Sequence, residues 1–120
     1  MKNLFTIYLV LNLVLEGIAA VTLLGAGTGL FTIDQFEGGM WSMNYGFAAI
    51  AIASAIFWVW PHRSKQDVVG PVLGILLVFH AALALSFMIQ STQTPSIIVH
   101  GCMALLGIFL YMRRSAWCEK

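Results

Sequence analysis

Charged side chains are scarce in this sequence. Six Lys or Arg and five Asp or Glu occur among its 120 residues, which is 9% of the chain, while 60% of the residues are hydrophobic. Because charged residues make up about a quarter of an ordinary soluble domain, this composition excludes a water-soluble surface. We therefore expect an integral membrane protein.

Several motifs that carry enzyme chemistry are absent as well. The sequence has no glycine-rich phosphate loop, no Cys-x-x-Cys metal spacing and no nucleophile elbow. Its two cysteines, Cys102 and Cys118, fall in an apolar stretch and in the C-terminal tail, so no disulfide is expected. The few basic residues are too dispersed for a nucleic-acid surface. These absences favour a non-enzymatic protein without a metal site or a nucleic-acid partner, although a membrane-embedded enzyme stays open.

What the sequence does contain is four long apolar stretches, at residues 4–24, 41–60, 68–90 and 96–112. At about 1.5 Å per residue they are about 25 to 35 Å long, which matches a hydrocarbon core of roughly 30 Å. The stretches are separated by polar or glycine-rich segments, the last of which is "STQTP". The pattern predicts an all-α, up-down-up-down four-helix bundle that forms one domain over residues 1–120.

The basic residues predict the orientation of this bundle. With four spans, every Lys and Arg falls on the face that holds both termini, whereas the opposite loops hold only Asp34 and Glu37. By the positive-inside rule, both termini should face the cytoplasm in a cytoplasmic (inner) membrane. The first span resembles a signal peptide, but it is of spanning length and contains Glu16, so we expect it to be retained.

Glu16 stands among leucines, isoleucines and valines in the first span. It lies twelve residues from the cytoplasmic start of that span, and His80 lies twelve residues from the cytoplasmic start of the third, so both are about 18 Å deep. A lone carboxylate in hydrocarbon is costly. We therefore predict a hydrogen-bonded or ionic Glu16–His80 pair near the midplane.

Glu16 also belongs to a stripe with Tyr8, Asn12 and Ala20, which recur every four residues and share one helix side. That side should face the bundle interior. One interpretation is that these groups satisfy each other and fix helix register. The other is a polar cavity for a proton, an ion or a ligand.

A second polar layer is expected nearer the outer boundary. His100 and Asn44 lie four and three residues inside their spans, and Tyr45 shares their level. Counted from the "STQTP" turn, His80 and His100 differ in depth by about 9 Å. Since axial haem ligands lie at nearly equal heights, this difference disfavours haem ligation by the two histidines within one copy.

Two family resemblances follow from these residues. The stretch "IYLVLNLVLEGIAAVTLL" resembles the first helix of the small multidrug-resistance transporters, which implies that Glu16 is a proton and substrate site. The third span, "VLGILLVFHAALALSFMIQ", lacks the Ala-Tyr-Trp-Gly motif of that family.

The whole chain is similar to DoxX-like small four-helix membrane proteins. The shared order is "NYG" at the head of the second span, "PHR" after it, a Pro-containing turn and a terminal "RR". That resemblance implies a compact bundle with an accessory role.

The function expected from the sequence is that of an accessory or assembly subunit. Such a subunit would be a homo-oligomer or part of a larger complex in the lipid bilayer. The first alternative is a proton-coupled carrier or binder of a small lipophilic ligand that uses Glu16 and His80, with Asn12 and Tyr8. The second is a haem- or quinone-binding subunit, although no cofactor is expected.

Overall fold

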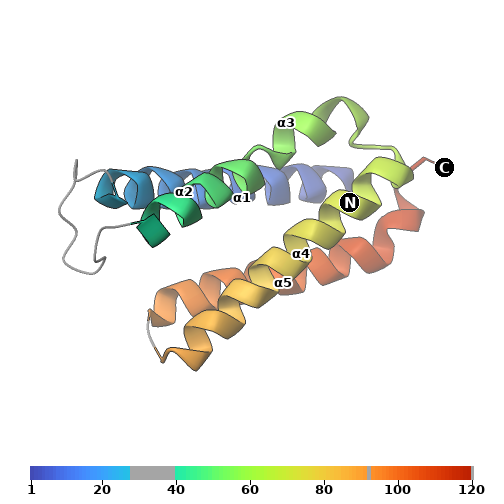
Figure 1. Cartoon of the computed structure of the whole chain (residues 1–120). Helices are drawn as coiled ribbons and strands as arrows, with labels where there is room; N and C mark the ends of the chain where they lie inside the picture. The colour runs from blue at the N-terminus through green and yellow to red at the C-terminus, as the bar shows by residue number, and fades with distance from the viewer. Residues whose placement is uncertain (28–39, 92, 120) are drawn as a thin grey trace. The chain divides into compact units, whose positions relative to one another are not determined.

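The computed structural model describes residues 1–27, 40–91 and 93–119, and within these ranges the chain is helical and contains no β-strand (Figure 1). The acidic loop residues Asp34 and Glu37 lie outside the described residues. The helices in chain order are α1 (Lys2–Gly27), α2 (Met40–Ala53), α3 (Ala55–Val59), η1 (Trp60–His62), α4 (Gln66–Ile89), α5 (Thr94–Arg113) and η2 (Arg114–Ala116).

Four helical segments of the described chain are long and apolar enough to cross a membrane. They comprise Lys2–Gly25, Trp41–His62, Gln66–Ile89 and Thr94–Ala116. Each coincides within a few residues with a stretch that the sequence predicts, so the prediction of four helices long and apolar enough to span a membrane is confirmed. Apolar composition decides this result, because only helices satisfy every backbone group within a single span.

The chain divides into two units. The hairpin unit comprises Met1–Tyr8 and Val59–Lys120, and the α1–α2 unit comprises Leu9–Trp58.

The hairpin unit is built on α4 and α5, which run side by side and are joined by a short turn (Figure 1). Gln93 adopts φ 53°, and α5 begins directly after it with Pro95 in its first turn, where the missing N–H of proline costs nothing. The buried residues of both helices recur at intervals of three and four, as in other helix pairs. They are Val69, Gly70, Leu73, Leu76 and His80 on α4, and Met103, Ala104, Gly107 and Leu110 on α5.

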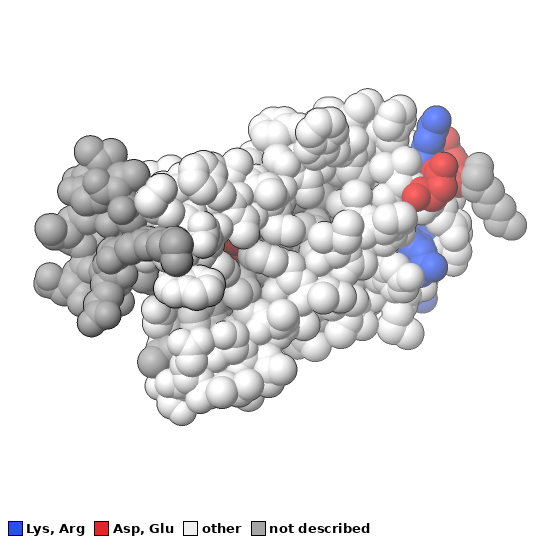
Figure 2. Space-filling view, viewed as in Figure 1, with Lys and Arg blue, Asp and Glu red and all other residues white. Residues whose placement is uncertain are grey.

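The C-terminal tail folds back onto the start of α4. Glu119 N–H donates to Ser64 at 2.6 Å, and Gln66 N–H donates to Glu119 at 3.0 Å. Trp117 also packs on Phe5, with ring centroids 5.3 Å apart. The charged side chains of the hairpin unit therefore gather at the end where α4 starts and α5 finishes (Figure 2).

In the α1–α2 unit, α2 packs closely along α1. A Cβ on Gly46 would lie 2.8 Å from Leu24 Cγ, so only glycine allows this approach. The second span is interrupted at Ser54, which separates α2 from α3. Ser54 Oγ donates to the Ala51 carbonyl at 2.8 Å and accepts from Trp58 Nε1 at 3.1 Å, and serine bonding to the preceding turn is a known cause of helix bends.

Candidate functional site

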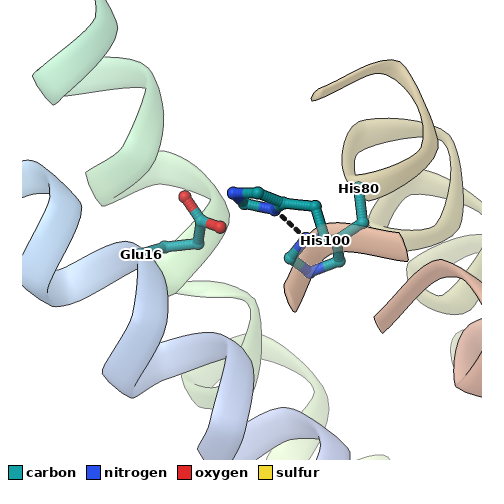
Figure 3. A group of neighbouring side chains, drawn as sticks. All are labelled: Glu16, His80 and His100. Atoms are coloured by element: carbon teal, nitrogen blue, oxygen red, sulfur yellow. Dashed lines mark hydrogen bonds between the residues drawn. The ribbon is translucent and has the colours of Figure 1, made fainter. Parts of the chain in front are cut away.

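The most distinctive polar contact of the hairpin unit joins His80 on α4 to His100 on α5. Their Nδ1 atoms are 3.0 Å apart, and their ring centroids are 5.2 Å apart with 33° between the planes (Figure 3). His80 is fully buried, and His100 is half-buried. Both residues lie well inside segments that are long and apolar enough to span a membrane.

The sequence placed these two histidines in separate layers, and the structure brings them together. The difference arises from where the helices end. His80 is nine residues before the end of α4 at Ile89, and His100 is six residues after the start of α5 at Thr94. The height difference is therefore about 4.5 Å rather than about 9 Å at the α-helical rise, and two imidazole side chains can bridge it.

Aromatic rings surround the histidine pair. Phe87 stacks on His100 with centroids 5.8 Å apart, and Phe79 meets His80 edge-on at 5.4 Å. Tyr8, at the start of α1, also meets His80 edge-on, at 6.4 Å. These contacts fix the ring planes and thereby hold the two Nδ1 atoms toward each other.

The Tyr8 side chain is fully buried, as its place in the predicted stripe requires. Its hydroxyl has no hydrogen-bond partner among the residues that the structure describes. The hydroxyl instead packs against Gly107, where an added Cβ would lie 3.0 Å from it. A buried hydroxyl without a partner is unfavourable, which makes Tyr8 a donor available to a bound ligand or water.

The other stripe residues belong to the α1–α2 unit. Asn12, Glu16 and Ala20 are all buried, with Glu16 only 1% exposed, so the prediction that this side of the helix faces inward is confirmed. Asn12 Nδ2 donates to the backbone carbonyl of Ile52 at 3.0 Å. This bond reaches α2 just before its interruption at Ser54.

The predicted pairing of Glu16 with His80 stays a prediction, because the two residues belong to different units, each described by itself. The remaining predicted residues, Asn44 and Tyr45, lie on α2. Asn44 is exposed, and Tyr45 is half-buried with a hydroxyl that has no hydrogen-bond partner within the described ranges.

The His80–His100 contact constrains the protons of both rings. A hydrogen bond between two Nδ1 atoms needs one donor and one acceptor, so the neutral rings must be opposite tautomers. The donating ring then has a lone pair on Nε2, and the accepting ring has a hydrogen there. The pair can therefore take up a proton at one Nε2, pass the shared proton across, and release one from the other Nε2.

The same contact bears on the haem alternative. Axial ligands of one haem lie on opposite faces of the porphyrin, whereas these two Nδ1 atoms touch each other directly. The pair has no space for an iron between its Nδ1 atoms. Haem ligation of this kind would require the rings to separate.

Comparisons of the chain with protein-family models, with curated proteins and with solved structures give no match. The resemblances to small multidrug-resistance transporters and to DoxX-like proteins therefore rest on the quoted residues alone. The geometry of the site itself is therefore the basis for its proposed function.

Proposed function

We propose that this protein handles a proton, or a small ligand that exchanges with one, at a polar centre inside the membrane. The observation that supports the proposal is the direct contact between His80 and His100 on two helices that are long and apolar enough to span a membrane. Ionisable side chains inside a membrane are costly and most often mark proton or ligand pathways. This pair has the donor and acceptor pattern that a proton relay needs.

We include Glu16 in this proposal because the sequence predicts that Glu16 and His80 lie at the same depth in the membrane. A protonated carboxyl group there would supply the proton, and an ionised one would accept it. The ligand class proposed is a lipophilic cation or a quinone, because either can enter from the hydrocarbon. Asn12 and Tyr8 would contribute further polar groups.

We also propose insertion in the cytoplasmic membrane with both termini inside. The support is the gathering of Lys2, Arg63, Lys65, Arg113 and Arg114 in the hairpin unit at the end where α4 starts and α5 finishes. Basic residues that flank spans favour the cytoplasmic side.

Proton flux into liposomes tests the proposed function. The full-length protein is reconstituted with a pH-sensitive dye inside, and a pH gradient is imposed with and without a lipophilic cation. We expect flux above that of empty liposomes, and we expect His100→Gln and Glu16→Gln to lower it by about 100-fold, the usual size for loss of a positioned proton-transfer group.

His62→Gln is the matched control for this assay, since His62 is exposed in η1, outside α4 and α5. It should retain full flux. Flux equal to that of empty liposomes under both conditions, or equal loss in the control, would contradict the proposal.

A second candidate function is that of an accessory subunit, or of a homo-oligomer. It is favoured by the large apolar side chains that the spans expose, including Ile18 at 63%, Val78 at 67% and Leu105 at 68%. Such surfaces contact lipid or pack against the helices of another protein. Extraction in a gentle detergent followed by mass measurement tests this role, and a lone monomer would count against it.

A further inference from the structure

A groove in the hairpin unit lies apart from the histidine pair. It is open, has a volume of about 700 Å³, and runs between the first turns of α4 and the end of α5. Asp67, Gly70, Pro71 and Gly74 contribute to its α4 wall, and Tyr111 and Arg114 form the opposite side. Its volume is within the range of small-molecule sites.

The α4 wall owes its shape to missing side chains. A Cβ added at Gly74 would meet nothing within 4 Å, so the space above this residue is empty. Pro71 has no N–H, and the carbonyl of Asp67 four residues earlier therefore has no helical donor. The sequence pattern Gly-Pro-x-x-Gly thus leaves an open channel above Gly74 and a backbone carbonyl, that of Asp67, without its usual helical donor.

Arg114 is held rigidly in this groove. Its guanidinium carbon lies 3.9 Å from the centroid of the Tyr111 ring, and its Nη1 donates to the Tyr111 carbonyl at 2.7 Å. Its Nε is 3.5 Å from the position that a Gly70 Cβ would occupy. No carboxylate of the described residues forms an ion pair with it, so most of its N–H groups remain available. A guanidinium fixed in this way is preorganised for an anion, and its planar fork matches phosphate.

The lining holds one cation, Arg114, and one acidic residue, Asp67. Further cations adjoin the lining in sequence: Lys65 precedes Gln66, Arg113 precedes Arg114, and both are exposed. Lys65 lies beside Glu119. The mouth also lies at the ends of two spans, Gln66–Ile89 and Thr94–Ala116.

The groove changes character along its length. Gly74 lies eight residues into α4, or about 12 Å deeper than its first residue at the α-helical rise. A charged mouth at the membrane boundary and an apolar channel leading into the hydrocarbon match the two parts of a phospholipid. Basic pockets between spanning helices on the cytoplasmic side are known to hold lipid headgroups.

We propose that this groove binds an anionic phospholipid, with the phosphodiester on Arg114 and the start of an acyl chain over Gly70 and Gly74. A free phosphate would need Arg114 but not the channel at Gly74. The binding of a phospholipid and the binding of free phosphate should therefore respond differently to substitutions along the groove.

Native mass spectrometry of the full-length protein in a mild detergent tests the proposal. The protein is titrated with phosphatidylglycerol and, separately, with phosphatidylcholine, and the bound fraction is measured. We expect retention of phosphatidylglycerol and a loss of about tenfold in affinity for Arg114→Gln, the usual size for a hydrogen bond to a charged group. Arg113→Gln removes the same charge outside the groove and should cause a clearly smaller loss.

Gly74→Leu tests the contribution of the channel independently of Arg114. Its side chain enters empty space, so the fold should tolerate it, but it fills the channel and should lower lipid affinity with Arg114 intact. Equal binding of both lipids, equal losses for Arg113→Gln and Arg114→Gln, or unchanged binding in Gly74→Leu would overturn the proposal. Displacement of the lipid by soluble glycerol phosphate at equal concentration would also overturn it, since the groove would then recognise phosphate alone.

Discussion

The side-chain amide of Asn12 donates to the backbone carbonyl of Ile52 at 3.0 Å, across forty positions of the chain. The bond connects α1 to the end of α2, beside the interruption of the second span at Ser54. In the membrane location that we propose, no water competes for either group, so the donor and the acceptor depend on each other.

Asn12→Leu should therefore destabilise the protein. The substitution keeps the number of side-chain heavy atoms but removes the donor to Ile52. We expect a loss between about 0.6 kcal/mol, the average for polar contacts between membrane helices, and about 1.7 kcal/mol, the largest measured. Unfolding in mixed micelles measures the change. Asn44→Leu makes the same substitution at an exposed position of α2 and should be nearly neutral, and equal losses in the two variants would refute a specific role for Asn12.

The two histidines of the pair should show opposite tautomers. Because one hydrogen lies between the Nδ1 atoms of His80 and His100, one ring must have its hydrogen on Nδ1 and the other on Nε2 when both are neutral. Nitrogen chemical shifts of a histidine-labelled sample distinguish these forms. His100→Gln should collapse the pattern to a single buried imidazole signal, and observation of the same tautomer at both rings would rule out the direct hydrogen bond.

Gly107→Ala should destabilise the hairpin unit relative to Gly101→Ala. Both changes raise helix propensity by about 1 kcal/mol. At Gly107, however, the new Cβ would lie 3.0 Å from the Tyr8 hydroxyl, whereas at Gly101 it would meet nothing within 4 Å. Overpacking costs about 1 to 3 kcal/mol, so thermal unfolding should separate the two variants by that amount. Equal stabilities would mean that Tyr8 moves aside freely.

The thiol of Cys118 should react slowly with a membrane-impermeant maleimide. Burial is the largest cause of its shift and raises the pKa of this thiol above the usual 9.0, while Arg114 opposes the shift. A raised pKa lowers the thiolate fraction at neutral pH, and the thiolate is the reactive form. The labelling rate should rise by about tenfold for each pH unit until the pKa is reached.

The same reagent reports the orientation of the protein. Labelling of Cys118 is expected only when the reagent reaches the cytoplasmic face, and Cys118→Ser should abolish it. Labelling from the opposite face alone would reverse the proposed orientation.

The sequence by itself determined that the chain forms four helices long and apolar enough to span a membrane, and that Tyr8, Asn12 and Glu16 share a buried side. Both results depend on local physics. A long apolar stretch must satisfy its own backbone bonds as a helix, and a spacing of four residues places side chains on one side whatever the neighbours are.

Tertiary structure alone decided which polar groups meet. Helix ends are the least certain feature of a sequence pattern. Because α4 ends at Ile89 rather than Gln90 and α5 starts at Thr94 rather than Ser96, the depth difference between His80 and His100 is half of that expected, and their Nδ1 atoms come within 3.0 Å. The bond from Asn12 to Ile52 and the contact of Glu119 with Ser64 likewise depend on how one helix packs beside another or how the C-terminal tail folds back. Such contacts follow from distances of a few ångströms between elements, which residue spacing within one element does not encode.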